Sequence, residues 1–258
     1  LENEGEIPHP FANRSKIHQL LGDASRAAGD YQDADDHHSE ALSIRRQWVA
    51  QSPTLGARIG LAVSLGKLGS LAQVRGDLNA AKNYMEEAVA LRRQIMQENP
   101  TMAAARLEYL GAQLVLAKVR FQQGDVDDGI AQMSGAVDGM REYAAQNPQS
   151  KSAQQNLAMF ETELGVMLLY TGKIPQAESN FDRAVLVLDD FLQEDPDNLK
   201  VHAELEDALY GLSVAREASG NTQDSAPLIQ RVVDLRRQAF DLDKSNLAKK
   251  LRLLAALA

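Results

Sequence analysis

The chain has 258 residues, of which 44% are hydrophobic, 5% are aromatic and 24% are charged, and its formal net charge is −9. An acidic chain is repelled by phosphate groups, which argues against nucleic acid or an anionic membrane surface as the main partner. The absence of cysteine excludes disulfides, thiol catalysis and cysteine-ligated zinc, but leaves the compartment open, with the cytoplasm slightly favoured. No run of 18 apolar residues occurs, so no membrane insertion by this segment is expected.

Residues 1–12 contain two prolines and an acidic start, and are predicted to be a disordered lead-in. From residue 13 onward, two kinds of residue punctuate the chain at a constant interval. Turn glycines stand at Gly29, Gly76, Gly124, Gly172 and Gly220, with steps of 47, 48, 48 and 48 residues. Prolines stand at Pro53, Pro100, Pro148 and Pro196, with steps of 47, 48 and 48 residues. Two markers with one period indicate an internal repeat, and a period of this size is typical of a solenoid.

Each repeat is predicted to be a pair of helices, as the second repeat illustrates. Leu61, Leu65 and Leu68 recur at helical spacing within a first helix over residues 56–75. Gly76 suits the left-handed position that ends a helix, and Asp77 suits the N-cap of the next one. The second helix runs over residues 78–98 and stops before a proline.

The two-residue links between helices of about 20 residues favour antiparallel hairpins. The predicted fold is therefore an all-α solenoid of five helical hairpins plus a C-terminal helix, forming one repeat domain over residues 13–258. The expected repeats span residues 13–53, 54–100, 101–148, 149–196 and 197–244, with a terminal helix over residues 246–258. That terminal segment matches the first helix of a sixth repeat, so it either caps the array or begins a further repeat.

Small residues recur where the two helices of a hairpin should meet. Ala34, Ala81, Gly129 and Ala177 share one position of the second helix, and Leu68-Gly69 and Leu164-Gly165 place a large residue beside a small one in the first helix. Together with the glycine turn, this set resembles the tetratricopeptide repeat (TPR) family. The usual family repeat has about 34 residues, so this longer period adds about two turns to each helix.

The resemblance implies a right-handed α-solenoid whose concave face, lined by the first helices, binds partners. Segments such as ALSIRRQWVAQSP are also similar to TPR regions of bacterial multidomain proteins, including serine/threonine kinases of planctomycete type. Carried over repeat by repeat, the inner positions include Met159, Thr162, Val166 and Leu169 in the fourth repeat and Asp207, Tyr210, Val214 and Glu217 in the fifth. The partner-binding residues predicted from this set and its neighbours are Leu114, Lys118, Phe121, Met159, Leu169, Tyr170 and Tyr210.

These mostly apolar positions suit an extended peptide or an amphipathic helix of a partner protein. The predicted function is a protein–protein interaction scaffold. Internal packing of the same side chains against neighbouring repeats is the alternative for each residue. A second function also remains open, namely a self-associating structural or regulatory spacer of a larger protein, forming a homo-oligomer. The apolar tail motivates it, through Leu251, Leu253, Leu254 and Leu257.

No enzymatic activity, cofactor or metal is predicted, because no glycine-rich phosphate loop, HExxH or GxSxG motif occurs. The cluster from Asp33 to His38 could offer metal ligands, but adjacent helical residues point about 100° apart. It is interpreted as a solvated helix start, where negative charge is favoured. Arginine pairs such as Arg45-Arg46 are expected on the outer part of the second helices, paired with glutamates including Glu87.

Overall fold

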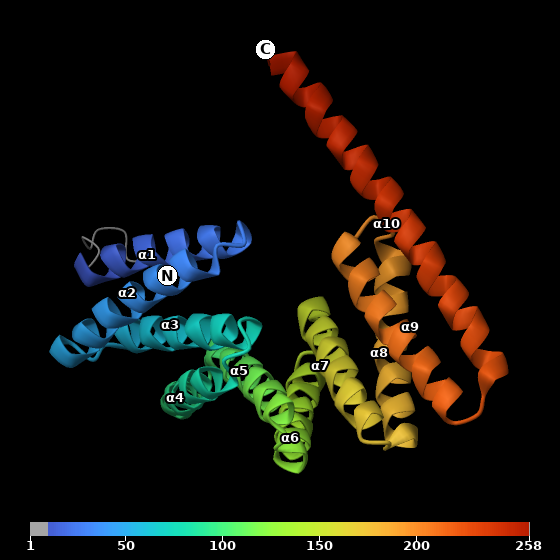
Figure 1. The fold of residues 1–258 in the computed structure, drawn as a ribbon, viewed down its shortest axis with the longest axis horizontal. Helices are drawn as coiled ribbons and strands as arrows, with labels where there is room; N and C mark the ends of the chain where they lie inside the picture. The colour runs from blue at the N-terminus through green and yellow to red at the C-terminus, as the bar shows by residue number, and fades with distance from the viewer. Residues whose placement is uncertain (1–9, 258) are drawn as a thin grey trace. The chain divides into compact units, whose positions relative to one another are not determined.

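The computed structural model describes residues 10–257, and the side chains of residues 10–244. Within this range the structure is helical and contains no strand (Figure 1). The helices are α1 (Pro10–Ala27), α2 (Tyr31–Gln51), α3 (Leu55–Val74), α4 (Leu78–Glu98), α5 (Ala103–Gln123), α6 (Val126–Gln146), α7 (Lys151–Tyr170), α8 (Ile174–Glu194), α9 (Leu199–Ala218) and α10 (Thr222–Leu257). The predicted all-α solenoid of helical hairpins is confirmed. Of the expected lead-in, residues 1–9 lie outside the described range, and residues 10–12 begin α1.

The chain forms two compact bodies, one up to Ala136 and one from Val137, so the boundary falls inside α6. In the N-terminal body α1 packs on α2 and α3 on α4, and in the C-terminal body α7 packs on α8 and α9 on α10. Successive hairpins contact each other through α2 and α3, α4 and α5, and α8 and α9. First helices also touch, α1 with α3, α3 with α5 and α7 with α9. Within each body, a helix therefore packs both on its partner in the hairpin and on the adjacent hairpin.

The glycine turns have one geometry throughout. All five glycines adopt positive φ, between 73° and 94°. In the second repeat the Gly76 N–H donates to the Gln73 carbonyl at 3.0 Å, and the Asp77 N–H donates to the Ala72 carbonyl at 2.9 Å. This is the Schellman arrangement that satisfies the last carbonyls of a helix. The Asp77 carboxylate then accepts from the Ala80 N–H at 3.0 Å and caps α4.

In the second and fourth repeats, the small residue of the predicted large-small pair lies against a large side chain of the second helix. A Cβ atom added to Gly69 would lie 2.6 Å from the Met85 Sδ, and one added to Gly165 would lie 2.8 Å from the Phe181 ring. Met85 and Phe181 are both fully buried. The absence of a side chain on the glycine therefore allows the two helices to approach closely.

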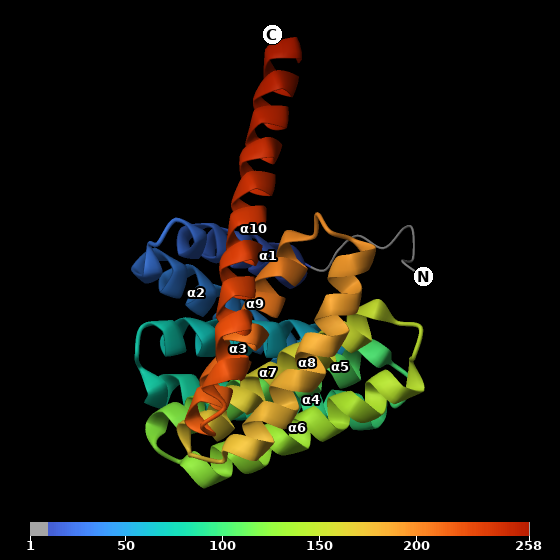
Figure 2. The same ribbon diagram turned by 90° about the vertical axis from the view of Figure 1, so that its right-hand side faces the viewer.

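The C-terminus differs from the prediction of a separate terminal helix over residues 246–258. One helix, α10, runs without interruption from Thr222 to Leu257 (Figure 2). Its only proline, Pro227, lies near the start, and no glycine or proline follows up to residue 257, so nothing in the local sequence forces a break. The side chains of the apolar tail lie outside the described range, and self-association through them stays a prediction. None of the described helices combines the length and hydropathy of a membrane span.

The arginine pairs separate into two environments. Arg46 forms the expected surface ion pair, 2.7 Å from Glu87. Arg45, expected on the outer surface, is instead only 5% exposed, and it donates to the Ser64 hydroxyl at 2.8 Å and to the Gln19 amide oxygen at 2.6 Å. Adjacent residues point about 100° apart on a helix, so one arginine of the pair faces the neighbouring helices. Burial lowers the pKa of Arg45.

The solvated helix start predicted for the Asp33–His38 cluster is wrong for His38. Its side chain is 1% exposed and occupies the position of the large core residue, against Gly22. Its Nε2 atom lies 3.7 Å from the Asp23 carboxylate. Burial lowers the pKa of His38, although the Asp23 charge opposes this shift. Among the described residues, no group of three or more histidines and carboxylates could hold a metal ion.

Replacing His38 by methionine, the residue at the equivalent position Met85, should flatten the pH dependence of stability. Because the pKa of His38 in the folded chain lies below its ordinary value of 6.5, the unfolded chain binds a proton first as the pH falls. The free energy of unfolding should therefore decrease below about pH 6.5 in the wild type. His38→Met should lose this contribution, whereas His37→Gln, at the adjacent and more exposed position, should keep it. Urea denaturation at a series of pH values measures both slopes; equal slopes in wild type and His38→Met would contradict the assignment.

The turn conformation can be tested with two glycines that both have open space where a side chain would begin. Gly76 has φ of 79°, whereas Gly111 lies inside α5, and a Cβ at either position meets nothing within 4 Å. Gly76→Ala should lower the free energy of unfolding by about 1–2 kcal/mol because of the left-handed backbone. Gly111→Ala should raise it by about 0.5–1 kcal/mol. Chemical denaturation followed by circular dichroism would show these opposite signs, and a stabilising Gly76→Ala would exclude backbone strain.

Candidate partner-binding groove

The C-terminal body contains a cavity between the first helices of the fourth and fifth repeats, α7 and α9. Its volume is about 610 Å³, within the usual range of ligand sites, about 300–1,000 Å³. The lining consists of Met159, Thr162, Glu163, Val166, Leu169, Tyr170, Ile174, Glu204, Asp207, Tyr210, Gly211, Val214 and Ala218. We call this cavity the α7–α9 groove.

Four of the predicted partner-binding residues line the α7–α9 groove. Met159, Leu169 and Tyr170 come from α7, and Tyr210 comes from α9. The two tyrosines are the most accessible, with 79% of Tyr170 and 55% of Tyr210 exposed. The structure therefore brings large, exposed apolar side chains of two helices to one concave surface. As binding residues they stay predictions.

The other three predicted residues lie on α5 in the N-terminal body and do not line this groove. Leu114 is 8% exposed, which fits the internal-packing alternative rather than partner binding. Ala112 and Leu116 of the same helix pack against Met85. Residues two apart on a helix point about 200° apart, so the burial of both Leu114 and Leu116 shows that α5 is covered on opposite sides. Lys118 and Phe121 are partly exposed.

The polar part of the groove is acidic. Glu163 of α7 and Glu204 and Asp207 of α9 contribute carboxylates, and none of the lining residues is a lysine or arginine. Partial burial raises the pKa of Asp207, and the nearby Glu206 and Glu163 carboxylates raise it further, whereas Arg236 opposes them. Glu163 and Glu204 were not among the predicted site residues. Glu204 could have been found from its spacing, since it lies one helical turn before Asp207.

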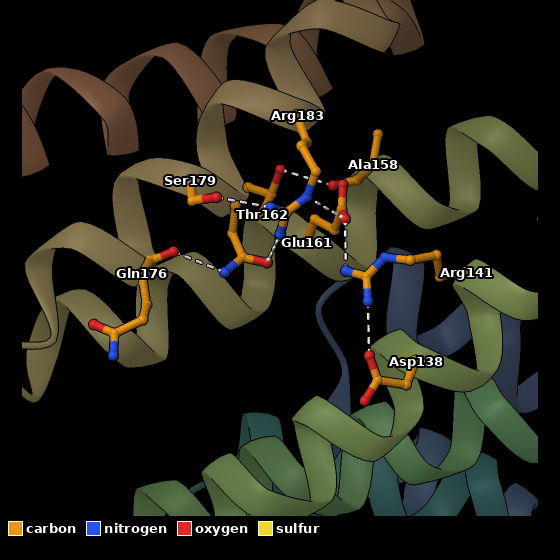
Figure 3. A network of polar contacts seen from close by, with 9 residues as sticks. Asp138, Arg141, Ala158, Glu161, Thr162, Gln176, Ser179 and Arg183 are labelled. Atoms are coloured by element: carbon orange, nitrogen blue, oxygen red, sulfur yellow. Dashed lines mark hydrogen bonds and ion pairs between the residues drawn. The ribbon is translucent and has the colours of Figure 1, made fainter.

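A buried carboxylate of α7 accepts hydrogen bonds from arginines of two neighbouring helices, α6 and α8 (Figure 3). Glu161, 2% exposed, accepts from the Arg141 Nη2 atom at 2.9 Å and from the Arg183 Nε atom at 2.7 Å. Arg141 also reaches the exposed Asp138 at 2.7 Å. These contacts connect α7 to the end of α6 and to α8. Because Glu161 precedes the groove residue Thr162, the network fixes the orientation of the groove-lining helix.

Helical hairpins whose first helices contact one another define a repeat scaffold of the α-solenoid class. A family model described as tetratricopeptide repeat matches residues 61–100. With the five glycine-turn hairpins, this match supports the resemblance to tetratricopeptide repeats, here with an elongated period. The predicted similarity to repeat regions of planctomycete-type kinases stays a prediction.

Solved structures of repeat proteins share the fold. BtubC (BKLC) from P. vanneervenii is 18% identical, with a TM-score of 0.67 over 88% of this chain and 81% of that one. The nearly identical TPR-like repeats of a protein from Podosopora anserina, assigned as a kinesin light chain, are 18% identical, with a TM-score of 0.65 over 92% and 100% of the two chains. The Rap conjugation gene regulator of plasmid pLS20, in complex with the Phr* peptide, is 15% identical, with a TM-score of 0.61 over 93% and 58%. Among curated proteins, none matches the sequence.

The contribution of Glu161 to the stability of α7 can be measured by comparison with Asp138, since both carboxylates bind Arg141. Glu161→Gln removes a buried charge that accepts two charged hydrogen bonds, and should lower the free energy of unfolding by about 1.5–3 kcal/mol. Asp138→Asn removes an exposed charge, and should change it by less than about 1 kcal/mol. Amide hydrogen exchange in α7, together with urea denaturation, measures the difference. Equal effects of the two substitutions would show that the buried network does not stabilise α7.

Proposed function

We propose that this chain is a protein-interaction scaffold that binds a peptide or helix of a partner protein in the α7–α9 groove. The observation that carries the proposal is that Tyr170, Tyr210 and Met159 line one cavity and are all accessible to solvent. Burial of exposed aromatic side chains by a partner lowers the free energy of the complex, and such residues often contribute most of the binding free energy.

The structural comparison supports this proposal. The pLS20 Rap regulator, whose fold matches 93% of this chain, holds a peptide in its solved structure. Stacked helical hairpins of this kind can therefore accommodate a peptide. The proposal is one of binding and includes no catalytic step.

The roles of the tyrosines can be tested with a double variant, Tyr170→Ala with Tyr210→Ala. Peptides selected by phage display on the wild-type chain supply the probes, and fluorescence anisotropy measures their Kd. If each tyrosine contributes about 1 kcal/mol or more, the double variant should bind about 30-fold more weakly. Its thermal unfolding should change little, because both side chains are largely exposed.

A matched control removes two exposed apolar side chains of the same body outside the groove, Leu186→Ala with Phe240→Ala. Both are 66% exposed, and they lie on the second helices α8 and α10. This variant should keep the wild-type Kd. The proposal is wrong if no peptide can be selected, if the control loses binding equally, or if circular dichroism shows that the tyrosine variant unfolds.

A further inference from the structure

The acidic residues of the α7–α9 groove indicate the charge of the partner, which its apolar residues alone do not. Glu204 and Asp207 lie one turn apart on α9, and Glu163 lines the same groove from α7. Partial burial raises the pKa of Asp207, and the neighbouring carboxylates raise it further, which means that these like charges repel one another. A cation placed among them would relieve that repulsion.

Two basic side chains near this cluster, Lys200 and Arg236, lie outside the lining of the groove. Glu204 lies 3.5 Å from the Lys200 ammonium and accepts from the Gln155 amide at 2.6 Å. The neighbouring Glu206 is paired with Arg236 at 2.6 Å, but Glu206 does not line the groove. The lining therefore contains three carboxylates and neither lysine nor arginine, so a cationic ligand complements its charge.

The apolar wall supports the same ligand. Tyr170 and Tyr210 line the groove, and the faces of tyrosine rings attract the cationic groups of lysine and arginine. Met159, Val166 and Leu169 supply adaptable apolar surface along α7. The whole chain carries a net charge of −9, which favours the approach of a positively charged partner from a distance.

On the basis of the proposed function, we infer that the α7–α9 groove selects a cationic amphipathic helix of a partner protein. Apolar residues of that helix would contact the tyrosines and methionine, and lysine or arginine residues one turn apart would face Glu163, Glu204 and Asp207. One-turn spacing on the ligand matches the i, i+3 spacing of Glu204 and Asp207 on α9.

Two synthetic peptides test this inference on the full chain. One is an amphipathic helical peptide with leucines along one face and lysines one turn apart at the edge of that face, so that both can reach the groove, and the second has every lysine replaced by glutamate. The lysine peptide should bind at least about tenfold more tightly, and its affinity should fall as salt screens the charges. Glu163→Gln with Asp207→Asn should remove most of this preference.

The matched control variant is Asp190→Asn with Asp197→Asn, which removes the same charge from exposed positions outside the groove. It should keep the preference for the lysine peptide. If both peptides bind equally and the tyrosine double variant weakens both, charge selection is wrong while groove binding stands. If neither binds but phage-selected peptides do, the inference fails alone, and if nothing binds, both proposals fail.

Occupancy of the groove by a second copy of the chain would also overturn the inference. Sedimentation of the wild type alone, compared with the Tyr170→Ala and Tyr210→Ala variant, detects this case. A wild-type dimer that dissociates in the variant would show that the groove is an interface between copies. If the wild type and the variant have the same oligomeric state, the groove is accessible to the partner helix.

Discussion

One bulky side chain packed over a glycine holds the two helices of a hairpin together at their closest approach. Met85 lies over Gly69 in the second repeat and Phe181 over Gly165 in the fourth, and both large side chains are fully buried. Dense packing at this contact determines how near the helices come and which of their faces is hidden. The glycine turn at the end of the first helix reverses the chain so that the second helix can pack on the first. This glycine is required for its backbone conformation rather than for close packing, because a side chain added there would meet nothing within 4 Å.

The groove is a consequence of this packing. Because the first helix of each hairpin meets its second helix through one face, another face is left for the first helix of the next repeat, as the contact between α7 and α9 shows. The side chains between them remain accessible, and they combine tyrosine rings with carboxylates. The buried Glu161 connects α7 to Arg141 of α6 and Arg183 of α8, so charged hydrogen bonds as well as apolar packing hold this groove-lining helix in position.

The places where the sequence misled are informative because each has a local physical cause. His38 occupies a core position although its neighbours in sequence are acidic and suggest solvent. Arg45 is buried with uncharged hydrogen-bond acceptors although its neighbour Arg46 forms a surface ion pair. The break expected before residue 246 is absent from α10, where the match of the terminal segment to the first helix of a further repeat suggested one. For His38 the acidic character of the adjacent residues motivated the expectation, whereas for Arg45 and the end of α10 the repeat period did.

The sequence alone determined the helices, the five turns and the hairpin pairing, since these depend on backbone conformation and on residue type at a fixed period. Through the resemblance to tetratricopeptide repeats, it also predicted Met159, Leu169, Tyr170 and Tyr210 as partner-binding residues of the inner face. Only the tertiary structure decided that these four line one cavity, that Leu114 is buried, and that Glu163 and Glu204 join Asp207 in an acidic cluster. The reason is that helical periodicity gives the direction of a side chain on its own helix, whereas its neighbours on other helices depend on how the repeats pack.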